Sequence, residues 1–491
     1  MTNARFKKPP AKRLLEYVHG PRLEEEKKAF YEYNDIDLAH TIMLVKQRIL
    51  SEEDGKAILG GLKEIRELGP DKFPTDPVVG SFLLQVEDYL FDKIGEEVGG
   101  KMHTGRSRID QGATVVRLKC RKGCLSVMEL LLKLQITLLE LAKQHVDTLT
   151  IFRTHLQHAQ PSTFGHFLVS YLYTFNHDFN RLSDTFKRIN LNPLGTAASV
   201  GTSWPLDRDR TSELLGFDDI DIPARRGYAI YDFAAECISV ITIALANLYD
   251  LATDLYLDST YEFRTVETAD EYCGSSSIMP QKKNPYGLEM VRRITGTAIG
   301  YLPSTLGQLR GCGTGDAMRG ASIMGEVFDN TTVALDLMQG IMETLTVHKD
   351  RMKELAGSCW ATASNLADVI VRVKGLSFRQ AHHVVARLVR NCIESNVKQD
   401  EVTPRMVDQA ALETIGIELG LDIETIKQAL DPENFVKTRV TRGSCNPLEV
   451  ERMIKDMTYM LEQEETWISE KKQQIEQSHR KLNEATEKIL N

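Results

Sequence analysis

The sequence predicts an all-α, mainly helical fold built from long helices, and three observations support this prediction. Apolar residues recur every three or four positions across residues 125–149, LSVMELLLKLQITLLELAKQHVDTL, while Glu129, Lys133, Glu140 and Lys143 mark a wetter side. Residues 232–257 are apolar almost all round. The chain also lacks the alternation of strand and helix patterns that a doubly wound sheet requires.

Further elements follow in order along the chain. Because the segment 232–257 carries carboxylates, we expect a helix surrounded by other helices rather than a membrane span. A third helix is expected from about residue 284 to 302, and the charged, periodic segment 447–490 predicts a long terminal helix. Glycine- and proline-rich breaks separate the helices, and we expect functional residues in these loops: 98–105, 191–205, 273–287 and 311–320.

Composition narrows the class of protein. A chain of 491 residues predicts two or three structural units. Its 60 basic and 69 acidic residues give a net charge of −9, which disfavours nucleic acid and anionic membranes as partners. The first residues lack the apolar core of a secretory signal, so we expect a cytoplasmic protein.

Cofactor and metal sites are not expected. The cysteines form no C-x-x-C pair and have no histidine beside them at zinc-like spacing. The glycine-rich GCGTGD at 311–316 follows no strand pattern and lacks the G-x-G-x-x-G spacing, so it predicts a hinge rather than a nucleotide-binding loop. The site is therefore predicted to act without a cofactor or a metal ion.

Three polar clusters stand out: MHTGRSRIDQ at 102–111, THLQHAQPSTFGH at 154–166 and GSSSIMPQKKNP at 274–285. Guanidinium, ammonium and hydroxyl groups satisfy carboxylate oxygens, so together the clusters suit a small dicarboxylate. Side chains able to do this are Arg106, Arg108, Lys282, Lys283 and Asn284. Taken alone, Ser276 reads as a turn residue, and His40, His382 and His383 as helix-face residues.

The order and separation of the motifs HTGRSRxDQ, THLQxAQP and SSxMPQKKNP resemble the argininosuccinate lyase family of the fumarase/aspartase superfamily. NPLGTAASVG, GLSFRQAH and RGSCNPLEV extend the resemblance over nearly the whole chain. It implies an N-terminal helical domain (1–103), a central long-helix bundle carrying the catalytic loops (104–360) and a C-terminal helical domain (361–491). The long helices would form the core of a homotetramer whose active sites each combine loops from three subunits.

The chemistry implied by this resemblance is a β-elimination that splits a C–N bond in an N-substituted aspartate, releasing fumarate and an amine. Removing the weakly acidic proton creates a doubly charged aci-carboxylate, which positioned cations and donors must stabilise. The residues implied as catalytic are Ser276 as the base, Lys282, Thr154, His155 and Glu289. Those implied to bind substrate are His103, Thr104, Ser107, Arg108, Gln157, Ser275, Met279 and Asn284. A shift of one residue would move the base to Ser275.

The amine side of the site departs from the family. Ile109 stands where the family has a substrate-binding asparagine, and DAMRGASIM (316–324) lacks the family's polar residues for the arginine part. Asp37 and Tyr33 replace a serine and an aspartate at positions expected to face substrate. We therefore expect an N-substituted aspartate other than argininosuccinate. If Arg319 faces the pocket, it can pair with a carboxylate on the leaving amine, as expected for an aminopolycarboxylate such as ethylenediamine disuccinate, whose lyase resembles this family. If Asp316 faces the pocket instead, a cationic amine is expected.

Other readings remain open at this point. Argininosuccinate itself, with an altered pocket, is one alternative substrate. Some members of the family are eye-lens crystallins that keep the fold without activity, so an inactive structural homologue is another. Adenylosuccinate cleavage and simple deamination of aspartate complete the alternatives.

Overall fold

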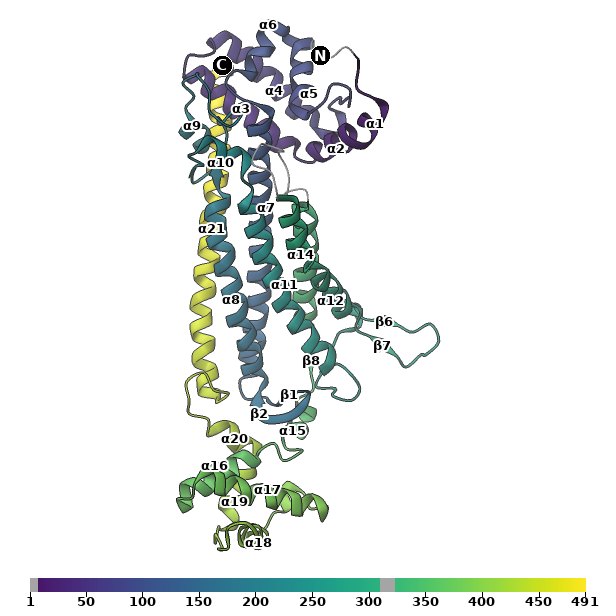
Figure 1. Ribbon diagram of the computed structural model, residues 1–491, viewed down its shortest axis with the longest axis vertical. Coiled ribbons are helices and arrows are strands. Elements are labelled where there is room, and N and C mark those ends of the chain that lie inside the picture. Colours follow the sequence, from purple (N-terminus) through teal and green to yellow (C-terminus); the bar gives the residue numbers. More distant parts are fainter. Residues whose placement is uncertain (1–7, 310–322) are drawn as a thin grey trace.

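The computed structural model describes residues 8–309 and 323–491 and is mainly helical, as predicted. Figure 1 shows three parts along the long axis, with an N-terminal group of helices at the top, a bundle of long helices in the middle and a small helical group at the bottom. The predicted domain boundaries of 1–103, 104–360 and 361–491 stay predictions.

The N-terminal group packs short helices around aromatic residues. Phe30, Phe73 and Phe82 contact one another with ring centroids 5.6 to 5.7 Å apart. Ser51 caps α4 by accepting a hydrogen bond from the backbone N–H of Asp54. The elements are α1 (Lys12–Leu14), η1 (Leu15–His19), α2 (Gly20–Lys27), α3 (Phe30–Lys46), α4 (Glu52–Lys72), α5 (Phe82–Ile94), α6 (Glu96–Gly99) and η2 (Gly100–His103).

Long helices lie side by side in the central bundle (Figure 1). Their apolar stripes form one large cluster of buried side chains to which α7, α8, α11, α12, α14 and α21 contribute. Gly123 on α7 allows Phe328 to approach, since an added Cβ would lie 2.3 Å from that ring. The helices are α7 (Arg108–Gln144), α8 (Phe164–Ile189), α11 (Asp232–Asp258), α12 (Tyr286–Ala298), α13 (Tyr301–Leu309), α14 (Met324–Glu343) and α21 (Pro447–Leu490).

The predicted long helices are present, with two differences in their bounds. Helix α7 begins at Arg108 and ends at Gln144, after which the chain turns into a strand at Leu149. The helix expected over 284–302 starts at Tyr286 and is broken at Gly300. Helix α11 is long and apolar enough to cross a membrane, but half of its most apolar window is buried inside this one chain, as in a core helix.

Short two-stranded ladders join the helices. They pair β1 (Leu149–Thr154) with β2 (Gln157–Thr163), β3 (Leu191–Asn192) with β4 (Asp219–Ile220), β5 (Val266–Glu267) with β8 (Thr346–Val347), and β6 (Gly274–Ser275) with β7 (Lys283–Asn284). The remaining connecting helices are α9 (Arg208–Leu215), α10 (Ala224–Ala229), η3 (Asp270–Tyr272) and α15 (Lys349–Ala356). Two of these ladders, β1–β2 and β6–β7, carry predicted site residues at their turns.

The C-terminal helical group has its own cluster of buried side chains, including Leu366, Val384 and Leu388. Its elements are α16 (Ala363–Lys374), α17 (Phe378–Glu394), η4 (Gln399–Glu401), α18 (Pro404–Ile415), α19 (Ile423–Leu430) and α20 (Pro432–Lys437). His382 and His383 lie exposed on α17, with ring centroids 6.1 Å apart. Their place on a solvated helix face agrees with the interpretation of these two histidines as helix-face residues.

Candidate active site

The first motif forms the segment at 103–108, which connects η2 to α7 and is fixed by hydrogen bonds to neighbouring helices. His103 Nδ1 lies 2.6 Å from Glu87 Oε1, so a carboxylate on α5 fixes the orientation of this imidazole. The hydroxyl of Thr104 donates to the carbonyl of Lys101 at 2.7 Å. His40 on α3 contacts the carbonyl of Thr104 through Nε2 at 2.9 Å. Side chains from two other helices therefore fix the backbone of this segment.

Asp110 ties this segment to the loop that carries NPLGTAASVG. The backbone N–H of Ser107 donates to Asp110 Oδ1 at 2.9 Å, and Ser107 caps the start of α7. Asp110 Oδ2 accepts the N–H groups of Gly195 and Ala197 at 3.0 and 2.9 Å. Burial raises the pKa of Asp110 to about 6, although these backbone donors oppose the shift. Arg108, in the first turn of α7, is left exposed.

Arg106 is not available to a substrate carboxylate, contrary to the expectation from the sequence. Its side chain is fully buried, and Nη1 lies 2.6 Å from Oδ1 of the equally buried Asp37. Gln111 donates to the same oxygen at 2.7 Å. Burial raises the pKa of Asp37, while Arg106 acts in the opposite direction. Asp37 and Tyr33 are both buried, so neither contacts solvent in this chain and the expectation that they face substrate is wrong.

The second motif lies on the turn of the β1–β2 hairpin. Thr154 pairs with Gln157, and the two residues between them, His155 and Leu156, have φ values of 54° and 60°. Two successive positive φ values form a tight hairpin turn that matches the twist of the strands. Thr154, His155 and Gln157 are consequently exposed at the tip.

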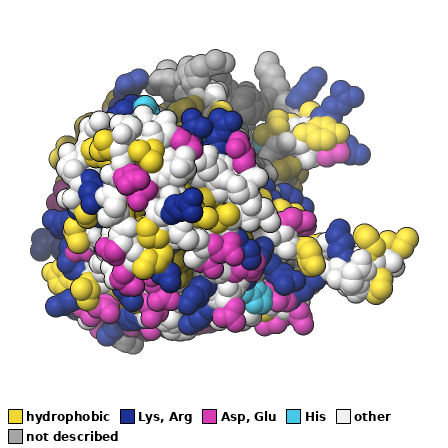
Figure 2. Space-filling view, turned by 90° about the horizontal axis from the view of Figure 1, so that it is seen from below, with side chains coloured by type: hydrophobic (Ala, Val, Ile, Leu, Met, Phe, Trp, Pro, Cys, Tyr) yellow, Lys and Arg dark blue, Asp and Glu magenta, His cyan; other side chains and the backbone are white. Residues whose placement is uncertain are grey.

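The third motif forms the β6–β7 hairpin, which projects from the side of the bundle (Figures 1 and 2). Its ladder consists of two residue pairs, Gly274 with Asn284 and Ser275 with Lys283. Ile278 and Met279 near its tip are 83% and 41% exposed. A projecting loop with so few ladder contacts belongs to the least stable parts of a fold, and this suits a segment that closes over a ligand.

Ser276 lies just beyond the paired residues of this hairpin. Its Oγ accepts hydrogen bonds from the backbone N–H groups of Ile278 at 3.3 Å and Met279 at 3.0 Å. Donors aimed at a hydroxyl oxygen favour its deprotonated form. Ser275 instead pairs with Lys283 within the ladder. This arrangement favours Ser276 over Ser275 as the group able to carry a negative charge.

The two adjacent lysines of the hairpin have different surroundings. Lys283 Nζ lies 2.8 Å from Glu267 and 2.6 Å from Asp270. Burial alone would lower the pKa of Lys283, but the two carboxylates outweigh it and raise the pKa above its ordinary value. Lys283 therefore anchors the hairpin, although its sequence position suggested carboxylate binding. Lys282 is exposed and has no ion pair among the described residues.

The three motif segments are far apart within one chain. Ser107 caps one end of α7 and the β1–β2 hairpin follows its other end, and a helix of 37 residues is about 55 Å long. Figure 1 shows the β6–β7 hairpin at a third position, on the side of the bundle. Glu289, in the first turn of α12, makes no hydrogen bond to His155 within the described part of this chain. Asp316 and Arg319 lie outside the described residues.

The sequence interpretation missed two residues that shape this site. Glu87 orients His103, and Asp110 joins α7 to the loop at 195–197. A buried acidic residue on an amphipathic helix was the available signal for Glu87, which is 5% exposed. For Asp110 the signal was its place three residues after the capping serine.

A mainly helical subunit with these three loop motifs defines a lyase of the fumarase/aspartase superfamily. Residues 25–300 match the lyase family, and residues 360–437 match the argininosuccinate lyase C-terminal family. Argininosuccinate lyase of Methanocaldococcus jannaschii is 40% identical over 442 residues, 89% of this chain and 90% of that protein. Argininosuccinate lyase of Methanococcus aeolicus is 38% identical over 468 residues, 95% of this chain and 94% of that protein.

Solved structures agree with this assignment. EDDS lyase in complex with formate superposes with a TM-score of 0.88 at 32% identity, covering 98% of this chain and 96% of that one. A fumarate lyase from Mesorhizobium sp. BNC1, at 18% identity and a TM-score of 0.72 over 92% of this chain and 99% of that one, shares the fold. The chain belongs to the argininosuccinate lyase family, and it is a carbon–nitrogen lyase.

Proposed function

We propose that this enzyme β-eliminates an amine from an N-substituted L-aspartate other than argininosuccinate, releasing fumarate in a reversible reaction. The observation that carries the substrate proposal is Ile109, a half-buried apolar residue directly after Arg108, where the family has a hydrogen-bonding asparagine. A site that lacks a polar partner for a substrate group discriminates against that substrate by orders of magnitude. Our candidate for the substrate is an aminopolycarboxylate, the class that includes the substrate of EDDS lyase, whose solved structure is 32% identical to this chain.

In this mechanism Ser276 Oγ takes the proton from the carbon next to one carboxylate. The N–H groups of Ile278 and Met279, which already reach this oxygen, stabilise its anionic form. Lys282 and Asn284 meet the charge that develops on the aci-carboxylate. The electron pair of the former C–H bond, which the aci-carboxylate carries, then forms the carbon–carbon double bond as the C–N bond breaks and the amine leaves.

The other motif residues bind the substrate and its leaving group. Thr154 and His155 help to protonate the departing amine, and Glu289 orients His155. The carboxylates are held by His103, Thr104, Ser107 and Arg108, with Gln157, Ser275 and Met279 completing the pocket.

The assembly in this proposal is a cytoplasmic homotetramer. The distance of about 55 Å along α7 supports it, because one chain cannot bring both ends of this helix to a single small substrate. Each active site then takes the segment at 103–108, the β1–β2 hairpin and the β6–β7 hairpin from three different subunits.

The test is to incubate the purified enzyme with fumarate and single amines, including arginine, ethylenediamine and amino acids, and to detect adducts by mass spectrometry. We expect adducts with an amine other than arginine, and none with the Ser276→Ala variant. Rapid formation of the arginine adduct would instead establish argininosuccinate as the substrate, the alternative that the 40% identical relative favours. Absence of adducts with every amine would favour an inactive, crystallin-like structural protein.

A further inference from the structure

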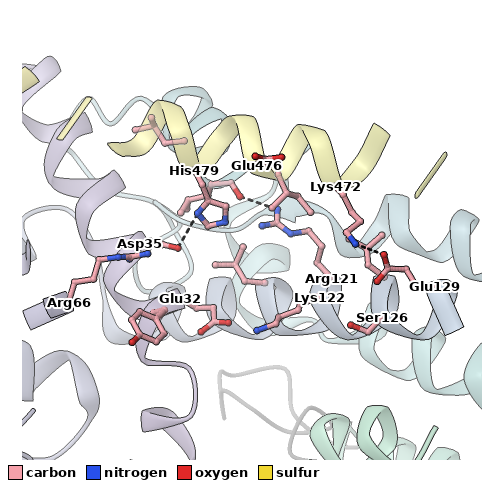
Figure 3. Close-up of a pocket in the computed structure, with 16 residues that line it drawn as sticks. Glu32, Asp35, Arg66, Arg121, Lys122, Ser126, Glu129, Lys472, Glu476 and His479 are labelled. Atoms are coloured by element: carbon pink, nitrogen blue, oxygen red, sulfur yellow. Dashed lines mark hydrogen bonds and ion pairs between the residues drawn. The ribbon is translucent and has the colours of Figure 1, made fainter. Parts of the chain in front are cut away.

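A cavity of about 650 Å³ lies between the N-terminal helices and the bundle, in a part of the molecule that the proposed reaction does not use. It is bordered by α3, α4, α7, α9 and α21, and Figure 3 shows charged side chains facing its interior. The α7 residues that line it, from Leu118 to Glu129, lie about 16 to 33 Å along the helix from Ser107. Its volume is in the range of pockets that bind small molecules.

Most charged groups in the cavity wall already have partners. Arg66 lies 2.6 Å from Asp35, and His479 approaches the other oxygen of Asp35 at 3.6 Å. Lys472 pairs with Glu129 across α21 and α7. Glu476 pairs with Arg480 at 3.0 Å. These groups neutralise one another and leave no net charge for a ligand.

Arg121 is different, because this residue is only 5% exposed and forms no ion pair among the described residues; its guanidinium lies over the ring of Phe217, 5.1 Å from the ring centroid. Its Nη1 donates to Asn190 Oδ1 and to the carbonyls of Leu215 and Gly216 at 2.9 to 3.0 Å. No bond from Nε or Nη2 to an acceptor occurs within 8–309 and 323–491. Burial lowers the pKa of Arg121 to about 10, so the group keeps its charge at neutral pH.

Lys122 and Glu32 are the other charged groups of the wall that form no ion pair among the described residues, although the charge of Glu32 acts on Arg121 from a distance. In Figure 3 their side chains point toward each other from α7 and α3, yet no ion pair joins them or links either to another described residue. Two cations and one anion thus remain for a ligand. A molecule with two carboxylates and one ammonium group has the complementary charges.

We propose that this cavity binds a small amino dicarboxylate, with its carboxylates on Arg121 and Lys122 and its ammonium group on Glu32. The site is separate from the proposed catalytic residues, so its existence does not depend on the identity of the lyase substrate. It joins α3 to α7, two helices that also hold the segment at 103–108.

Calorimetric titration of the purified enzyme tests this site, with L-glutamate as the probe and glutarate, which lacks the ammonium group, as its comparison. We expect glutamate to bind once per chain and glutarate to bind at least about tenfold more weakly. Lys122→Ala and Glu32→Gln should each weaken glutamate binding by about tenfold or more. Lys133→Ala, which removes an exposed lysine elsewhere on α7, should leave binding unchanged.

Two further outcomes would overturn the proposal. Failure of glutamate to bind the wild-type enzyme is the first. The second is binding that survives Lys122→Ala and Glu32→Gln but is lost in Arg108→Ala, because the ligand would then occupy the catalytic site. The lyase reaction with fumarate, measured on the same variants, should keep its wild-type rate for Lys122→Ala and Glu32→Gln, which separates this test from that of the proposed function.

Discussion

The segment at 103–110 and the β6–β7 hairpin belong to the same proposed active site but are built in opposite ways. Glu87, His40 and Asp110 hold the first segment through side chains from several elements. The hairpin projects from the bundle and is held by two ladder pairs and the anchor at Lys283. Under the proposed mechanism, substrate recognition and proton removal therefore belong to parts of different rigidity. The preformed segment would set the position of the substrate, and the movable hairpin would bring the base.

The largest effect should come from the movable part. Ser276→Ala removes the proposed base and should lower turnover about a thousandfold, because general-base catalysis contributes on this order. The oligomer and its melting temperature should stay nearly unchanged, since within the described part of the chain the Ser276 hydroxyl bonds to its own loop alone. Steady-state kinetics and calorimetry measure both quantities. Ser275→Ala is the matched control, and if it is the inactive variant, the base lies one residue earlier.

Mixing two inactive variants tests whether the two parts come from different chains. Hybrids of Ser276→Ala and His155→Ala subunits, formed by co-expression, should recover about a quarter of wild-type activity, since random mixing gives that share of sites with both native residues. Hybrids of Ser276→Ala and Lys282→Ala should recover none, because both changes lie on one hairpin. Equal recovery in the two mixtures would contradict composite sites.

A third change should destabilise the protein beneath the segment at 103–110. Asp37→Ala leaves the buried guanidinium of Arg106 without its counter-ion, which costs about 3 to 5 kcal/mol of unfolding free energy. Asp270→Ala removes an exposed ion pair, the one with Lys283 near the hairpin, where the aspartate side chain is 93% exposed. This change should have little effect on the unfolding free energy, because solvent screens such a pair. Urea unfolding compares the two. Similar costs would mean that the two regions do not differ in rigidity as described.

The smallest expected effect is a pH dependence of the unfolding free energy, and it comes from Glu464 in the helical bundle. Burial raises the pKa of Glu464 to about 7, although Gln135 and Asn176 donate to its oxygens at 2.8 and 2.7 Å. Since this pKa is raised on folding, the stabilisation is full below pH 4.5 and is lost as the pH rises through 7.

Glu464→Gln removes this titration. From pH 5 to pH 8 the variant should gain up to about 3 kcal/mol of stability relative to wild type. The measurement is urea unfolding at several pH values. Glu465→Gln, a change at the exposed neighbour, should follow the wild-type pH profile. A constant difference between Glu464→Gln and wild type would contradict the shifted pKa.

Helix positions were accessible from the sequence because apolar periodicity is a local property. Helices α11 and α21 fall where the pattern placed them. The start of α7 did not, because Arg117 and Arg121 interrupt its apolar stripe. Both are nevertheless buried: Arg117 donates to Asp221 and to the carbonyl of Arg188. Both guanidinium groups donate hydrogen bonds to acceptors more than sixty residues away in the sequence, and no local pattern shows these acceptors.

The candidate site was likewise predictable only in part. The motifs identified the three loops, but whether each charged group is already in an ion pair depends on its neighbours in the folded chain. The sequence predicted that Arg106 and Lys283 bind a substrate carboxylate. In the structure Arg106 instead forms an ion pair with Asp37, and Lys283 forms ion pairs with Glu267 and Asp270. The two N–H groups on Ser276 likewise depend on the turn geometry of the hairpin. The spacing of the motifs identifies candidate residues, and tertiary contacts decide which of these residues can still bind a substrate.

Helix α21 follows, in the sequence, all of the helices that it packs against, and this order has a consequence for biosynthesis. This helix of 44 residues supplies Met457 and Leu461 to the core of the bundle and Leu482 to the core of the N-terminal helices. Neither core is complete until α21 has been translated. The nascent chain therefore exposes apolar surface on its earlier helices until this helix has been synthesised, and folding of this enzyme should depend on chaperones.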